Sequence, residues 1–96
     1  MNDILKIELK IADVEPITLK IDRAEERVYR KAAELINNTW ADLRQVHKNK
    51  SSHYVLALAA LATAEVYYRK SGQIEAQGRM IDDFEKQLDE LLLKVE

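Results

Sequence analysis

Few side chains in this sequence are suited to catalysis or metal binding. The only histidines are His47 and His53, which flank a polar stretch at residues 48–52. Two histidines on a loop could share a metal ion, but no cysteine and no HExxH spacing accompanies them. Solvated loop histidines are much the commoner case. The absence of cysteine also excludes thiol catalysis, disulfides and cysteine-type zinc sites.

The adjacent carboxylates are poorly placed for acid–base catalysis. Glu25-Glu26 and Asp82-Asp83 lie in predicted helices, where sequence neighbours point about 100° apart. Ser51 and Ser52 are better explained as helix caps than as nucleophiles, because no base is placed beside them. Two glycines and one proline cannot build a glycine-rich phosphate loop. We therefore expect no enzyme activity, no cofactor and no metal.

Charge and hydropathy disfavour two further classes of protein. The formal net charge is −2 and the pI is near 5.7, whereas nucleic-acid binders usually carry a basic surplus. The longest apolar run, residues 55–68, is shorter than the roughly twenty residues of a membrane-spanning helix. The N-terminus has no secretion signal. We expect a cytoplasmic protein that neither binds nucleic acid nor spans a membrane.

The first part of the chain alternates between apolar and polar residues. This alternation over residues 5–11 and 17–21 predicts a β-hairpin with one apolar face. A pairing of Leu9 with Leu19 places every apolar side chain on that face. Two strands are marginal in water, so the apolar face needs a cover.

A helix that begins after Asp22 supplies this cover. Asp22 and Glu25 have the spacing of a capping box. Apolar residues then recur at spacings of three and four, which is typical of an amphipathic helix. They form two stripes: Val28, Ala32, Leu35, Thr39, Leu43 and Val46, and Tyr29, Ala33, Ile36 and Trp40. The two stripes together are wider than one hairpin can cover, which indicates a second protein surface.

The rest of the chain predicts a long second helix. No proline interrupts residues 53–96, and a continuous helix of that length would span roughly 65 Å. Gly72 and Gly78 each cost about 1 kcal/mol relative to alanine, which leaves a bend or a break near Ser71-Gly72 as the alternative. The first half of the helix is apolar nearly all round, and its second half carries a heptad seam in which Gln77 is the polar exception. Such a helix cannot be covered by its own small head, so we expect an obligate oligomer. The predicted oligomerisation residues are Leu56, Ala60, Tyr67, Ile74, Ile81, Phe84, Leu88, Leu91 and Val95.

These elements predict an α+β fold in two parts. Residues 1–52 form a globular head of hairpin and helix, and residues 53–96 form a long helix that ends in an oligomeric coiled coil. The outer face of the hairpin and the exposed side of the first helix carry mixed charges that suit protein docking. The candidate partner-binding residues there are Lys10, Lys20, Arg23, Arg27 and Arg30.

The order of these elements resembles the ZapA family of bacterial Z-ring-associated cell-division proteins. The resemblance covers residues 4–70 and rests on RVYRKAAELIN at residues 27–37 and LALAALA at residues 56–62. It implies a head that binds the tubulin-like GTPase FtsZ, and dimers that join through their tails into tetramers. Such tetramers would crosslink and bundle FtsZ filaments at midcell. A coiled-coil scaffold with an unrelated partner is the alternative.

The hairpin tip departs from the pattern of this family. The family commonly carries glycine followed by arginine at the tip, which is implicated in filament contact. The tip here reads Ala12-Asp13-Val14-Glu15, which is acidic and has no glycine. Lys10, Lys20 or Arg23 are the nearby cations that could substitute for a basic tip.

Overall fold

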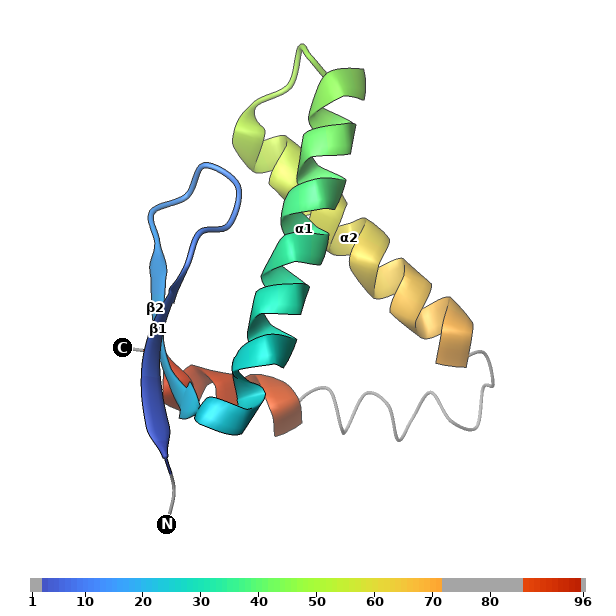
Figure 1. The fold of residues 1–96 in the computed structure, drawn as a ribbon. Coiled ribbons are helices and arrows are strands. Elements are labelled where there is room, and N and C mark those ends of the chain that lie inside the picture. The colour runs from blue at the N-terminus through green and yellow to red at the C-terminus, as the bar shows by residue number, and fades with distance from the viewer. Residues whose placement is uncertain (1–2, 72–85, 96) are drawn as a thin grey trace.

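A computed structural model describes residues 3–71 and 86–95 of the chain (Figure 1). A two-stranded antiparallel hairpin precedes two helices, which confirms the predicted α+β class. The elements are β1 (Ile4–Leu9), β2 (Ile17–Asp22), the 3-10 turn η1 (Arg23–Glu25), α1 (Glu26–Val46) and α2 (Ser52–Ser71). Residues 86–94 are also helical, and we call residues 86–95 the C-terminal segment.

The hairpin has the predicted faces but not the predicted register. Leu9 pairs with Ile17, and Ile7 pairs with Leu19, so the predicted pairing of Leu9 with Leu19 is wrong by two residues. A shift of two residues leaves every side chain on the same face, so alternation determines the face and leaves the register open. The loop over residues 10–16 determines the register instead.

A residue with a left-handed backbone lies in this loop. Ala12 has φ of 53°, and the N–H of Val14 donates to the carbonyl of Ile11 at 3.0 Å to close the turn. A β-carbon is crowded in this conformation, whereas glycine adopts it without steric cost. The turn therefore forms at some expense of stability.

The Ala12→Gly variant is expected to be more stable than the parent by about 0.5–1 kcal/mol, because the steric cost exceeds the added chain entropy of glycine. Thermal unfolding followed by circular dichroism measures the difference. Ala41→Gly, at an exposed position of α1, is the matched control and is expected to lower stability by about 1 kcal/mol. An equal loss in both variants would show that position 12 is not strained.

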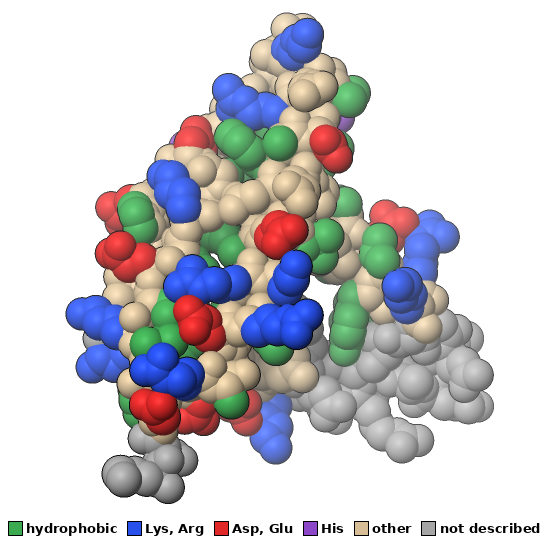
Figure 2. All heavy atoms as spheres, viewed as in Figure 1, with side chains coloured by type: hydrophobic (Ala, Val, Ile, Leu, Met, Phe, Trp, Pro, Cys, Tyr) green, Lys and Arg blue, Asp and Glu red, His purple; other side chains and the backbone are tan. Residues whose placement is uncertain are grey.

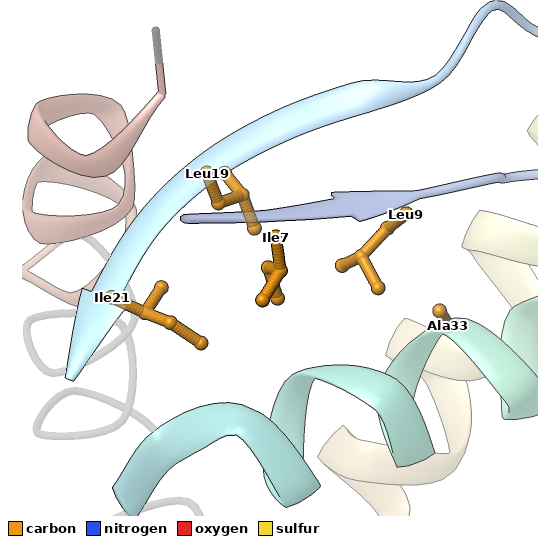
Figure 3. Packing of buried hydrophobic residues seen from close by; sticks show 5 residues of the cluster. All are labelled: Ile7, Leu9, Leu19, Ile21 and Ala33. Carbon is orange, nitrogen blue, oxygen red and sulfur yellow. The ribbon is translucent and has the colours of Figure 1, made fainter. Parts of the chain in front are cut away.

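The core lies between the hairpin and α1 (Figure 3). The inner-facing side chains of the hairpin point toward α1, where Ala33 offers a small surface that lets the sheet approach closely. The buried residues of this cluster are Ile7, Leu9, Leu19, Ile21 and Ala33, and Val55 and Ala59 of α2 are buried outside it. Burial of these aliphatic groups is the main favourable contribution to the folding of the head.

The predicted caps lie at the 3-10 turn that precedes α1 and at the start of α2, while α1 itself begins four residues after Asp22, at Glu26. The N–H of Asp22 donates to Oε1 of Glu25 at 3.2 Å, which is the backward contact of a capping box. The hydroxyl of Ser51 accepts a hydrogen bond from the N–H of Tyr54 at 3.1 Å at the start of α2. The indole N–H of Trp40 donates to the carbonyl of Ser52 at 3.3 Å and ties the two helices together beside their connection.

The two apolar stripes of α1 have different surroundings. The stripe that contains Ala33 faces the hairpin and α2. The other stripe leaves Val28, Leu35 and Val46 more than half exposed in the single chain. The wide apolar arc predicted from the sequence is therefore present, and part of it is uncovered.

The C-terminal segment lies against the head of its own chain. Leu91 packs against the core cluster, and Val95 forms an isolated antiparallel bridge with Leu19 of β2. In Figure 1 the segment runs past the base of α1 beside the hairpin. A helix that ran straight for roughly 65 Å from residue 53 would not bring Val95 to Leu19, so these contacts do not fit an unbent tail.

The C-terminal segment packs on the head because Leu91 and Val95 have no partner helix in a single chain, whereas the apolar side of the hairpin is open to them.

The predicted passage of the helix through Gly72 and Gly78 lies outside the described residues. The division into residues 1–52 and 53–96 stays a prediction.

Candidate protein-binding site

The predicted partner-binding cations do not form one patch. Lys10 lies at the tip of the hairpin and Arg23 at its base, because β1 and β2 are antiparallel. Lys20 lies between them on the outer face, directly opposite Lys6. Figure 2 shows blue and red side chains mixed over the hairpin and the lower part of α1. The five cations therefore lie among acidic side chains and do not form a purely basic surface.

Arg27 and Arg30 lie together on the exposed side of α1. They border a shallow depression of about 300 Å³, whose lining also contains Glu26, Lys31 and Glu34. Arg30 Nε is 2.9 Å from Glu26 Oε2, and Lys31 Nζ is 3.6 Å from Glu34 Oε2. Exposed pairs of this kind contribute about 0–1 kcal/mol each, so an incoming carboxylate can replace the intrachain partner at little cost. This depression is the most compact group of cations among the five candidates.

Arg23 is held by the start of β1. Its Nε is 2.7 Å from Asp3 Oδ2, and both side chains are more than half exposed. The N–H of Arg23 also donates to the carbonyl of Asp3 at 2.9 Å. Arg23 therefore lies at the base of the hairpin, directly before the first turn of α1.

Asn37 holds the hairpin tip on α1. Its Nδ2 donates to the carbonyl of Lys10 at 2.8 Å, and its Oδ1 accepts from the N–H of Ala12 at 2.6 Å. The side chain thus satisfies the backbone on both sides of Ile11. The pattern of residue types did not indicate this role. The available signal was an amide four residues after the buried Ala33, on the apolar side of the helix.

Asp13 faces the connection between α1 and α2. A hydrogen bond from the Ser52 hydroxyl lowers the pKa of Asp13 below its ordinary value, and the positive charges of Arg44 and His53 add to this effect. Lys10 Nζ donates to the carbonyl of Val14 across the same loop. The tip carboxylate is therefore directed toward its own chain.

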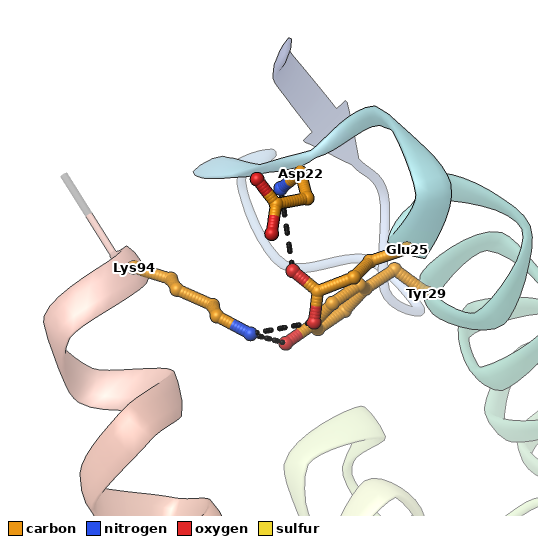
Figure 4. Close-up of polar contacts among 4 residues, drawn as sticks. All are labelled: Asp22, Glu25, Tyr29 and Lys94. Carbon is orange, nitrogen blue, oxygen red and sulfur yellow. Dashed lines mark hydrogen bonds and ion pairs between the residues drawn. The ribbon is translucent and has the colours of Figure 1, made fainter. Parts of the chain in front are cut away.

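Glu25, Tyr29 and Lys94 join the C-terminal segment to the start of the helical region (Figure 4). Lys94 Nζ is 2.8 Å from Glu25 Oε2 and donates to the Tyr29 hydroxyl at 3.1 Å. Glu25 uses its other oxygen for the N–H of Asp22, so both oxygens of this carboxylate are engaged. The hydrogen bond from Lys94 lowers the pKa of Glu25, and the hydrogen bond to Glu25 raises the pKa of Lys94.

These pKa shifts predict how the contact depends on pH. The stability that Glu25 gains from its lowered pKa is fully present above pH 4.5, the ordinary pKa of a glutamate. It is lost as the pH falls through the lower pKa of Glu25 in the folded chain. The stability that Lys94 gains from its raised pKa is fully present below pH 10.5 and is lost as the pH rises through the higher pKa of Lys94 in the folded chain. Because Glu25 is partly exposed, we expect an effect of about 0.2–1 kcal/mol. Urea unfolding of the parent and of Glu25→Gln measures it, and their difference should shrink at acid pH.

An apolar crevice lies between α1 and α2. It has a volume of about 390 Å³ and is lined by Leu35, Thr39, Ala62, Thr63, Val66 and Tyr67. The neighbouring Leu61 is 65% exposed. One predicted oligomerisation residue, Tyr67, therefore borders an uncovered apolar surface.

The other predicted oligomerisation residues have varied surroundings. Leu56 is half-buried and Ala60 is exposed on α2, while Leu88 is 44% exposed in the C-terminal segment. Leu91 and Val95 contact the head. Ile74, Ile81 and Phe84 lie outside the described residues. The structure of one chain thus leaves the predicted seam a prediction.

Other kinds of site are not found in the described part of the chain. Residues 3–71 and 86–95 contain no group of three or more histidine, cysteine, aspartate or glutamate side chains that could hold a metal ion. His47 is half-buried and His53 is exposed. Within the same residues, no helix combines the length and apolar character needed to cross a membrane.

A comparison with known protein families shows which family the chain belongs to. A family model described as Cell division protein ZapA matches residues 7–95. The chain belongs to the ZapA family. The match extends from β1 through both helices to Val95, so it includes the hairpin, the arginines of α1 and the C-terminal segment. No curated protein and no solved structure shows significant similarity to this chain.

ZapA membership makes the hairpin tip the most informative departure. The glycine expected from the family resemblance would suit the left-handed backbone that Ala12 adopts here. Asp13 stands where a basic residue is expected, and its carboxylate is engaged by Ser52. The five predicted partner-binding cations are exposed and lie along the hairpin and on α1, and their role stays a prediction.

Proposed function

We propose that this chain is a non-enzymatic cell-division protein that binds FtsZ filaments through its head and crosslinks them as an oligomer. The match of the ZapA model over residues 7–95 is the observation that supports this proposal. Binding and bundling of FtsZ is the role that the resemblance to this family implies. The protein would then act in the cytoplasm, at the midcell division site.

The docking surface that we propose is the exposed side of α1 together with the base of the hairpin. Arg27 and Arg30 border one depression, and Arg23 lies one helical turn before Arg27. Arg23 and Arg30 pair with the exposed Asp3 and the half-buried Glu26, and acidic groups on a filament can replace these carboxylates. Lys10 and Lys20 extend the same charge along the outer side of the hairpin.

Crosslinking requires at least two heads in one particle. The uncovered apolar crevice between α1 and α2 and the predicted heptad seam supply surfaces for a homodimer and then a homotetramer. Each head can bind weakly, because a filament offers many sites at a high effective concentration.

Co-sedimentation with FtsZ and GTP tests this function. The protein should pellet with the polymer and raise the pelleted fraction of FtsZ. A triple charge reversal, Lys10→Glu, Lys20→Glu and Arg23→Glu, is expected to lower co-pelleting at least about tenfold without changing the mass of the oligomer.

Two further variants make this test specific. Arg27→Glu with Arg30→Glu examines the α1 depression separately. The matched control reverses Arg44, Lys48 and Lys50 near the far end of α1, and it should leave binding near the parental value. If the protein stays in the supernatant while FtsZ pellets, the division role is wrong, and the scaffold alternative remains.

A further inference from the structure

The C-terminal segment contributes the same side chains to two contacts that cannot coexist. Leu91 and Val95 are positions of the predicted heptad seam, and in the single chain both lie against the head. A side chain that packs against the hairpin cannot pack at the same time as a knob between helices. We propose that the C-terminal segment is an autoinhibitory latch, which binds the head of its own chain and must leave it before two tails associate.

The head presents an apolar surface to this segment. An almost wholly apolar hollow of about 310 Å³ lies between the hairpin, α1 and the segment, and Leu91 and Val95 form its wall on the side of the segment. Val95 adds to the open edge of β2 by its bridge with Leu19. Pairing of an extended residue with an exposed sheet edge is a common mode of peptide recognition.

A polar contact fixes the position of the segment on this surface. The Lys94 ammonium lies between the Glu25 carboxylate at 2.8 Å and the Tyr29 hydroxyl at 3.1 Å. The Lys94 side chain is 24% exposed, whereas the ion-paired side chains of Arg23, Arg30, Lys31 and Arg69 are each more than half exposed. A charge-assisted hydrogen bond is directional, so it selects one placement of the helix on the head.

The same contact is weak enough to be released. Leu92 and Leu93 of the segment are 71% and 87% exposed, so the head covers only part of its apolar surface. The polar groups of the segment are held by the contacts of Lys94 with Glu25 and Tyr29 and by the bridge between Leu19 and Val95. The apparent association of tails is reduced by the fraction of chains that are latched, and rising protein concentration favours the open form.

This inference rests on the proposed assembly through the tail, and its tests contain no FtsZ. The first test is Glu25→Gln, which keeps an acceptor for the Asp22 N–H but removes the charge opposite Lys94. Tail association, measured by light scattering over a dilution series, is expected to become about two- to fivefold tighter. Glu26→Gln is the matched control, since Glu26 pairs with Arg30 in the same helical turn, and it should leave association unchanged.

Two results of this test would overturn the latch. Unchanged or weaker association in Glu25→Gln would show that the Lys94 contact does not oppose assembly. Leu88→Lys should lower the mass of the oligomer, because Leu88 belongs to the seam and is 44% exposed in the single chain. If Leu88→Lys leaves the mass unchanged, tails do not associate, and there is nothing for a latch to inhibit.

A cysteine pair provides an independent measurement, because the chain has no cysteine of its own. Leu19 and Val95 are bridge partners, and such partners lie within the distance that a disulfide spans. Because Leu19 belongs to the core, the double variant is first required to keep the circular dichroism of the parent. Leu19→Cys with Val95→Cys is then expected to form an intrachain disulfide at low concentration and to assemble less than its reduced form. A disulfide that forms only between a tagged and an untagged copy would overturn the proposal, because the segment would then belong to the neighbouring head.

Discussion

The Ile21→Ala variant is expected to be largely unfolded at 25 °C. Ile21 is 1% exposed and lies in the core between the hairpin and α1. Truncation of a buried isoleucine typically costs about 2–5 kcal/mol, through lost transfer free energy and the cavity left behind. A core of this size rarely supplies more than about 3–5 kcal/mol in total, so the loss is comparable with the whole stability of the head.

Circular dichroism and a urea titration measure this effect. Ile4→Ala is the matched control, since it removes the same atoms from the same hairpin at a position that is 57% exposed. We expect the control to lose less than about 1 kcal/mol. Equal losses in the two variants would mean that the hairpin does not pack on α1 in solution.

The Asn37→Ala variant is expected to free the hairpin tip and to cost about 1–3 kcal/mol. It removes the donor to the Lys10 carbonyl and the acceptor for the Ala12 N–H, and both backbone groups lose their partner at once. The same loop carries Asp13, so its contact with Ser52 should weaken as well. The expected readouts are a lower urea midpoint and faster hydrogen exchange of the Ala12 amide.

Two matched variants interpret this result. Asn38→Ala changes the neighbouring exposed residue of α1 and should alter stability by less than about 0.5 kcal/mol. Asn37→Asp keeps an acceptor for Ala12 but loses the donor to Lys10, so its cost should lie between the other two. If Asn37→Ala behaves as Asn38→Ala does, the tip is held by other contacts.

Local patterns in the sequence predicted the elements well. The alternation of residues 5–11 and 17–21 identified the strands and their buried faces, and Asp22 and Ser51 identified the helix starts. These features depend on neighbours a few residues away, which a sequence displays directly. The register failed because a two-residue shift keeps each face intact, so only the loop geometry at Ala12 distinguishes the two pairings.

The contacts that determine the candidate site join distant parts of the chain. Asn37 reaches back 27 residues to Lys10, and Lys94 reaches back 69 residues to Glu25. Neither pairing leaves a periodic signal in the sequence. The cations were predicted from their residue types alone, so their spacing in three dimensions, with Lys10 at the tip and Arg23 at the base, appears only in the fold.

The distance along the chain between Lys94 and Glu25 also implies an order of folding. Closing a loop costs chain entropy that grows with its length, so contacts between near neighbours form before one that spans 69 residues. The hairpin and α1 are complete in the growing polypeptide while the C-terminal segment is still to be synthesised. The hairpin and α1 are therefore expected to pack together first, and the apolar surface that they leave open is covered only when the last residues of the chain arrive.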